Sequence, residues 1–307
     1  MNVSHKDSDP DCAIQVVFHD EPAVLSDSFA ALQDGAHTTS DFPTILRVVM
    51  VVRIRWVPHK KHDIVDEMEV LPIQDVLEMS SGIEFNEDYA NPDASINVLG
   101  QRIFLGQTTD DWIAQRKRAR APGTEHYYSS IDTQVLGMVL KAATGKSVAQ
   151  YMQEKLWSPM GAEGDARWVT DAHGVVLAFA GLNARLRDYA RFGQLYLDGG
   201  RNLRGEQVLP QEWVGMSVKP RTPYLQPGRE MEHGNPRLGY AYQWWVPKGG
   251  EGEFTAIGVY GQFIYVNPMR RVVIAKNSAY VDYNKDGTQM EYQSIEAFRA
   301  IARSLRP

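Results

Sequence analysis

Three hydroxyl side chains, those of Tyr128, Ser129 and Ser130, stand together where a turn meets a helical pattern. A Pro-Gly pair at residues 122–123 supplies the turn, and a buried helical face follows. Hydroxyl groups fixed at the start of a buried helix can hold a reactive group at the wall of a cleft. On spacing alone, a plainer interpretation is favoured, in which one of the serines only caps the helix.

The helix that positions these hydroxyls is indicated by apolar residues that recur every three or four positions. They mark one buried face, formed by Ile131, Val135, Leu136, Val139, Leu140 and Ala143. Gly145 follows where a left-handed C-cap residue is expected. We therefore predict a helix that begins at Ser130 and ends before Gly145.

Local patterns predict further elements on both sides of this helix. Helices are expected at residues 26–33, 73–79, 110–119, 147–157, 184–200, 210–217 and 292–305. Ser147 with Gln150 forms a capping box, and Asn183 is expected to cap the helix that follows it. Strands are expected at residues 13–18, 44–57, 242–246, 254–258, 262–266 and 272–277, the last two joined as a hairpin by Asn267-Pro268. This order predicts an α+β fold with an antiparallel sheet.

Composition narrows the class of protein. The chain has 307 residues, enough for one large domain or one domain with a subdomain, and a net charge of -6 without a basic patch. We therefore expect no nucleic-acid partner. No apolar run is long enough to span a membrane, and we expect no membrane partner. The single cysteine, Cys12, excludes an internal disulfide. No secretory signal is recognised, so the expected location is the cytoplasm, or the periplasm if the N-terminus is incomplete. The oligomeric state stays open.

Motifs for metals and cofactors are incomplete. His59, His62 and Asp63 have no second cluster to complete a metal site, and a solvated loop is favoured there. Gly145-Lys146-Ser147 lacks the earlier glycine and the preceding strand of a phosphate-binding loop. The aspartates near residue 284 begin a calcium-loop pattern, but Gln293 stands where glutamate is required. We therefore predict no metal and no cofactor.

Four stretches in the same order resemble one family. They are residues 71–89, 122–137, 181–200 and 256–278. Together they are similar to the serine β-lactamase-like hydrolases, in particular the class C-like branch that includes 6-aminohexanoate-dimer hydrolases and related esterases. The resemblance implies a β-lactamase/transpeptidase-like fold over residues 71–307. In it, an antiparallel sheet is flanked by helices, with a mostly helical region at about 71–218 and the C-terminal strands and helix at about 240–307.

The resemblance also implies roles for individual residues in acyl transfer through a serine. Tyr128 matches the tyrosine that relays protons to the leaving group. The backbone N–H of Val259 matches an oxyanion donor at the end of a strand. The implied substrate contacts are Ser130, which stands where asparagine is usual, with Tyr89, Ile257, Gly258 and Trp245. Trp245 is equally consistent with a core residue.

The nucleophile motif of the family, Ser-x-x-Lys, is absent. No lysine in the chain has a serine or threonine three residues before it, and residues 1–70 do not match the family. Three explanations stay open: a shifted coding frame over residues 14–70, which we favour, a natural pseudoenzyme, or another nucleophile. Ser81 is the obvious substitute, but its Ser-Ser-Gly segment ends a helix in active relatives too, so we interpret it as structural.

The expected function follows from the family resemblance and from the missing nucleophile motif. The chain is expected to be a serine hydrolase of small-molecule amides or esters that acts through an acyl-enzyme, impaired here because Ser-x-x-Lys is absent, so that its nucleophile is unknown. The alternative is a non-catalytic protein that binds a peptide-like or acyl ligand in the same cleft.

Overall fold

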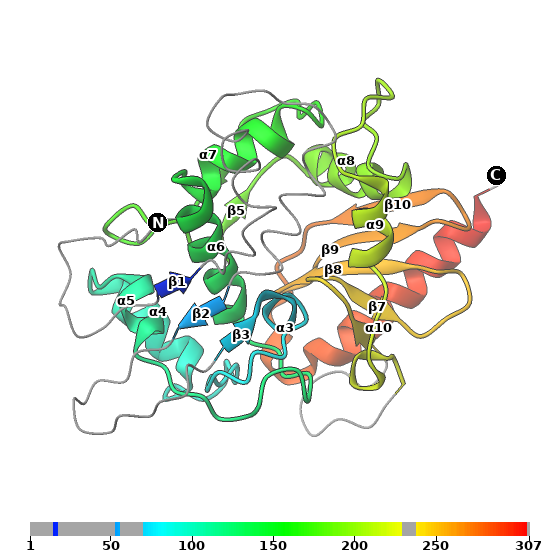
Figure 1. Ribbon diagram of the computed structural model, residues 1–307. Helices are drawn as coiled ribbons and strands as arrows, with labels where there is room; N and C mark the ends of the chain where they lie inside the picture. Colours follow the sequence, from blue (N-terminus) through cyan, green and yellow to red (C-terminus); the bar gives the residue numbers. More distant parts are fainter. Residues whose placement is uncertain (1–14, 18–52, 56–69, 229–237, 306–307) are drawn as a thin grey trace, which may run out of the picture.

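The computed structural model describes residues 15–17, 53–55, 70–228 and 238–305. Helices make up most of one side of the molecule, and an antiparallel sheet with one long helix makes up the other (Figure 1). This arrangement confirms the predicted α+β class. The predicted helix at 26–33, most of the predicted strand at 44–57 and the loop at 59–63 lie outside the described residues.

The larger sheet has five antiparallel strands in the order β10-β9-β8-β7-β6. Their bounds are β6 Leu238–Tyr240, β7 Trp245–Pro247, β8 Phe254–Gly258, β9 Gln262–Asn267 and β10 Val272–Lys276. The predicted hairpin is confirmed, because Val272 pairs with Asn267 at the start of the β9–β10 ladder. A smaller antiparallel sheet joins β1 Gln15–Val17, β2 Arg53–Arg55 and β3 Val70–Pro72.

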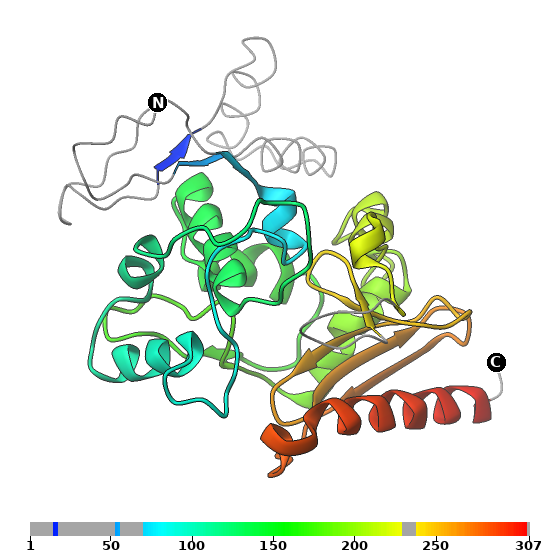
Figure 2. The same ribbon diagram turned by 90° about the horizontal axis from the view of Figure 1, so that it is seen from below.

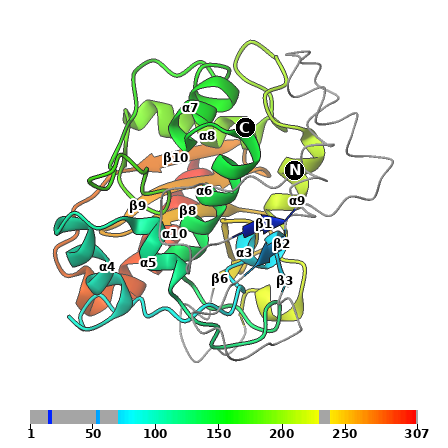
Figure 3. The ribbon, with the colours of Figure 1, turned by 60° about the vertical axis from the view of Figure 1, so that its left-hand side comes forward.

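Helices cover both faces of the five-stranded sheet. The long α10, Tyr283–Ser304, lies along one face (Figure 2). There the ring centroids of Phe298 and Phe263 are 5.3 Å apart. On the other face α8, Leu186–Leu197, approaches so closely that Gly193 lies against Val273. Figure 3 shows α10 behind the sheet, with α6 and α8 in front of it.

The helical region is built around α6, Ser130–Thr144. The other helices are α3 Ile73–Leu77, α4 Ser95–Phe104, α5 Thr109–Ala114, α7 Val148–Met152 with a π-helical continuation at Gln153–Trp157, α9 Gln211–Ser217 and a 3-10 turn at Pro223–Leu225. Two short strands, β4 Arg167–Trp168 and β5 Leu182–Asn183, pair beside α8. A core of buried side chains fills the space between α3, α4, α5 and α6, and Ile131, Val135 and Val139 from the predicted apolar face of α6 belong to it.

The ends of α6 and α7 follow the predicted local signals. Ile131 and Val135 are buried, and Gly145 ends α6 with a left-handed φ of 68°. The Ser147 side chain accepts the backbone N–H of Gln150, while the Gln150 side chain accepts that of Ser147, which confirms the capping box.

Several element boundaries differ from the prediction. Asn183 is not a helix cap, because it pairs in β5 and α8 begins only at Leu186. The strand predicted at 242–246 is interrupted by Gln243, whose φ of 62° breaks extended backbone, so β7 begins at Trp245. The helix predicted at 110–119 ends at Ala114. The last helix begins at Tyr283, nine positions before the predicted start at Tyr292, across a kink at Asp286 where helix propensity is low.

Candidate active site

Tyr128 lies immediately before α6 on an aromatic support. Its ring stacks on that of Trp245 with centroids 5.4 Å apart and an interplanar angle of 20°, and it meets Tyr240 edge-on at 6.3 Å. The Pro-Gly turn holds the approaching chain, because the backbone N–H of Gly123 donates to the carbonyl of Ser80 at 2.9 Å. The turn and the ring contacts therefore fix the position of the phenol.

Glu87 joins the loop before α4 to the start of α6. The backbone N–H of Ser130 donates to Glu87 Oε1, and the hydroxyls of Ser130 and Tyr89 also hydrogen-bond to this carboxylate. The other oxygen, Oε2, is buried and has no hydrogen-bond partner among the described residues. Burial raises the pKa of Glu87, and the hydrogen bonds from Ser130 and Tyr89 partly oppose that rise. The sequence patterns do not point to Glu87, although it stands two positions before Tyr89.

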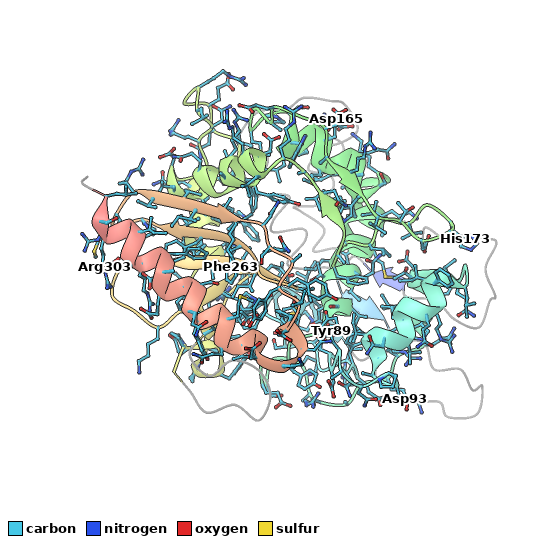
Figure 4. The ribbon with its side chains drawn as sticks, turned by 180° about the vertical axis from the view of Figure 1, so that it is seen from behind. Tyr89, Asp93, Asp165, His173, Phe263 and Arg303 are labelled. Carbon is cyan, nitrogen blue, oxygen red and sulfur yellow. The ribbon has the colours of Figure 1, made fainter. Side chains whose placement is uncertain are left out.

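A second carboxylate reaches the same cluster from α10. The hydroxyl of Tyr283 donates to Glu291 Oε1 at 3.2 Å. Burial, then Glu87 and then Glu291 raise the pKa of Tyr128 above that of an ordinary tyrosine. Figure 4 shows Tyr89 next to the end of α10 that faces the helical region. We call Glu87, Tyr89, Tyr128, Tyr283 and Glu291 the tyrosine–carboxylate cluster.

The two serines after Tyr128 differ in their contacts. Ser129 occupies the N-cap position of α6, but its hydroxyl makes no cap hydrogen bond and is buried without a partner in the part of the chain that the structure describes. The expectation that a serine here serves only as a cap is therefore wrong for Ser129. Ser130 is the first residue of the helix and is held by Glu87.

Ser81 has a different environment. Its hydroxyl donates to Asp132 Oδ1 at 2.6 Å and accepts the backbone N–H of Ile83 at 3.2 Å. Asp132 is fully buried, and burial raises the pKa of this carboxyl to about 8, although the hydrogen bonds from Ser81 lower it. These contacts tie the end of α3 to α6, as expected for a structural serine.

The end of β8 borders a cavity of about 660 Å³. The cavity extends from this strand towards β5 and the start of α8. Its lining includes the predicted Ile257 and Gly258, and the described lining residues are Gly181, Leu182, Asn183, Ala184, Tyr189, Ala256, Ile257, Gly258, Tyr260, Gln262, Phe263, Ile264 and Asn277. Val259 follows β8 directly and begins the turn to β9.

Aromatic contacts connect this cavity to the tyrosine–carboxylate cluster. The ring of Tyr260, which lines the cavity, lies 5.7 Å from that of Tyr283. Trp245 supports Tyr128 and packs in the same hydrophobic cluster as Ile257. Trp245 is absent from the described cavity lining, so its contacts are those of a support beneath Tyr128.

The predicted absences can be examined only within the described residues. Among them, no three histidine, cysteine, aspartate or glutamate side chains are grouped so that they could hold a metal ion. In the same part of the chain, no helix is both long and apolar enough to cross a membrane.

Comparisons with known proteins point to the same family that the four sequence stretches resemble. Residues 68–297 match the family model described as "Beta-lactamase". A 6-aminohexanoate-dimer hydrolase from Paenarthrobacter ureafaciens is 28% identical over 233 residues, which cover 74% of this chain and 58% of that protein, so the match spans less than two thirds of its length. A Bacillus anthracis structure assigned to the 6-aminohexanoate-dimer hydrolases aligns over 94% of this chain and 74% of its own, at 22% identity and a TM-score of 0.57. A penicillin-binding protein from Bacillus halodurans aligns over 74% of each chain, at 13% identity and a TM-score of 0.53. The last two similarities are of fold.

Proposed function

Because the chain belongs to the β-lactamase family, we propose that it derives from hydrolases that cleave amide or ester bonds through an acyl-serine, and that its own catalysis is impaired. The observation that carries this proposal is the placement of Tyr128, which stands at the start of α6 and stacks on Trp245. Trp245 in turn packs with Ile257 of the strand that leads to Val259.

In the proposed mechanism each group has one task. Tyr128 carries a proton between the attacking hydroxyl and the leaving group. The backbone N–H of Val259 stabilises the negative charge that develops on the carbonyl oxygen. Ser130 and Tyr89 contact the substrate, and Gly258 lets the substrate approach the end of β8. A substrate is thus held between the tyrosine–carboxylate cluster and the strand.

Two observations support impairment. No lysine follows a serine or threonine at the required spacing, so the chain lacks the family's nucleophile motif. Burial and the carboxylates of Glu87 and Glu291 also raise the pKa of Tyr128, so its phenol is a weaker acid than that of an ordinary tyrosine and, protonated at neutral pH, cannot act as a general base. A nearby ammonium would have the opposite effect on this pKa.

The missing motif also supports a second candidate, a non-catalytic protein that binds an acyl or peptide-like ligand in the same cleft. The division between a foreign segment at 1–70 and a family domain at 71–307 remains part of the proposal. Translating the coding DNA of residues 14–70 in the two other frames tests why the nucleophile motif is missing. If neither frame encodes Ser-x-x-Lys within a helical pattern, frame damage is excluded.

Reaction with p-nitrophenyl butyrate separates the two functions. Release of p-nitrophenol with an acyl adduct on the intact chain, detected by mass spectrometry, supports the hydrolase, and Tyr128→Phe should then slow the release. Binding of the amide N-methylbutyramide, without p-nitrophenol release from the ester and without any adduct, supports the binding protein. If the folded chain shows neither release nor binding, both functions are excluded for this site.

A further inference from the structure

The walls of the cavity beside β8 are mainly apolar, and several of their polar side chains are hydrogen-bonded within the protein. Among the described lining residues there is no acidic, basic or histidine side chain. The Tyr189 hydroxyl donates to the carbonyl of Leu182, and the Asn183 amide donates to that of Gly181 at 2.8 Å. The Gln262 side chain is bonded to both the N–H and the carbonyl of Ser278. The protein itself therefore satisfies most of the polar side chains in the wall.

The described lysine closest in sequence to this wall, Lys276, is not among the described residues that line the cavity. Lys276 pairs across the ladder with Phe263 and shares its face of the sheet, where Phe263 packs on α10. Its ammonium donates to the carbonyl of Gly261 at 3.2 Å and lies 5.2 Å from the centre of the Phe263 ring. Because the described lining itself contains no basic side chain, a carboxylate in the cavity would lose its hydration without gaining an ion pair from these residues, which is unfavourable.

The neighbouring tyrosine–carboxylate cluster adds negative charge on the side next to the cavity. Tyr260 in the wall contacts Tyr283, whose hydroxyl is bonded to Glu291. Glu87 belongs to the same cluster. An anionic ligand near Tyr260 would meet two carboxylates, whereas an uncharged one would not be repelled.

From these observations we propose that the cavity binds the acyl part of the substrate, and that this part is an uncharged apolar chain rather than one carrying a carboxylate. The proposal rests on the proposed function, since it is the Val259 end of β8 that would place a substrate carbonyl at the mouth of the cavity. A volume of about 660 Å³ is ordinary for a small-molecule site, and an apolar wall favours burial of methylene groups.

Equilibrium binding tests the proposal without any turnover. Isothermal titration calorimetry of the full chain would compare three ligands. N-methyloctanamide is the reference, octanoate has the same chain length but carries a charge, and N-methylacetamide is uncharged but has a short chain. We expect the octanamide to bind at least about tenfold more tightly than either of the other two. Equal or tighter binding of octanoate would overturn the proposal, and so would equal binding of the short amide.

A charge introduced into the wall provides a second measurement. Ala256→Lys places an ammonium in the cavity and should raise the affinity for octanoate relative to N-methyloctanamide. Ala149→Lys adds the same charge on the exposed side of α7 and should leave that ratio unchanged. An unchanged ratio in a folded Ala256→Lys protein would contradict the proposal. Binding of octanamide without ester turnover would count only against the proposed catalysis.

Discussion

The backbone N–H of Ser130 donates to the carboxylate of Glu87, 43 residues earlier in the chain. This contact fixes the first residue of α6 to the loop that carries Tyr89, whose hydroxyl bonds to the same carboxylate. Two of the proposed substrate contacts therefore share one acceptor. Glu87 thus positions both without itself being required to touch the substrate.

Replacing Glu87 should therefore loosen the start of α6. Glu87→Ala leaves the Ser130 amide and the Tyr89 hydroxyl without their acceptor, and we expect the free energy of unfolding to fall by about 1–3 kcal/mol. Glu87→Gln retains an acceptor oxygen and should lose less. Urea denaturation measures both, with Glu84→Ala as a control at an exposed position of the same loop. A loss in Glu87→Ala no larger than in the control would show that the shared acceptor contributes nothing to stability.

Asp132 should make the stability of the protein depend on pH. Its folded-state pKa of about 8 lies above the ordinary value of 3.8 because the carboxyl is buried. Between these values the unfolded chain releases a proton that the folded chain keeps, so the free energy of unfolding falls as pH rises from about 4 to about 8. Below this window the effect is absent, and above it the loss is complete.

Asp132→Asn should remove this slope, because an amide does not ionise and can still accept from Ser81. Urea midpoints for the two proteins should be similar near pH 4, and the variant should become the more stable of the two by pH 8. Asp111→Asn, on the exposed side of α5, controls for the chemical change. If the urea midpoints of Asp132→Asn and of the unmodified chain depend on pH in the same way, the raised pKa of Asp132 is contradicted.

Local signals in the sequence account for much of the fold. The apolar face of α6, the Ser147 capping box and the β9–β10 hairpin are set by residues within a few positions of one another, so spacing alone predicts them. Spacing does not predict α4, although Leu99 is fully buried, because the polar and glycine residues of this helix weaken the apolar pattern. The predicted start of α10 is wrong for a related reason, since Gly287 and the neighbouring aspartate have low helix propensity.

The site is less accessible to prediction. The family resemblance points to Tyr128, Ile257 and Gly258, and the structure places the first on Trp245 and the others beside the cavity. No sequence pattern indicates Glu87 or Glu291, because their contacts with the tyrosines cross from one element to another. No periodicity within a single segment encodes such a contact, so only the folded chain shows it.

Gly193 should be required for the packing of α8 on the sheet. A Cβ atom there would lie 2.7 Å from Val273 Cγ1 and 3.0 Å from Ile264 Cγ2, closer than real contacts allow. We expect Gly193→Ala to lower the free energy of unfolding by about 1–3 kcal/mol through overpacking. Gly215→Ala in α9 is the matched control, because its Cβ meets nothing within 4 Å. That variant should gain about 0.5–1 kcal/mol from improved helix propensity. The same sign of change in both variants would exclude close packing as the cause.

The ionisation of Tyr128 tests whether its surroundings suppress proton transfer. Burial and the carboxylates of Glu87 and Glu291 raise its pKa, so the phenol should stay protonated where an ordinary tyrosine, with a pKa of about 10, ionises. Difference absorbance of tyrosinate near 295 nm should then be the same for the unmodified chain and for Tyr128→Phe up to about pH 11. One additional tyrosine titrating near pH 10 in the unmodified chain would show that the two carboxylates do not act on Tyr128.

The Glu87→Gln variant tests the contribution of one carboxylate. Removing this charge should lower the pKa of Tyr128. The titration curve of Glu87→Gln should therefore diverge from that of the Glu87→Gln, Tyr128→Phe double variant at a lower pH than the curve of the unmodified chain diverges from that of Tyr128→Phe. A nearby cation would lower this pKa, so a suppressed titration would agree with the proposed impairment of catalysis.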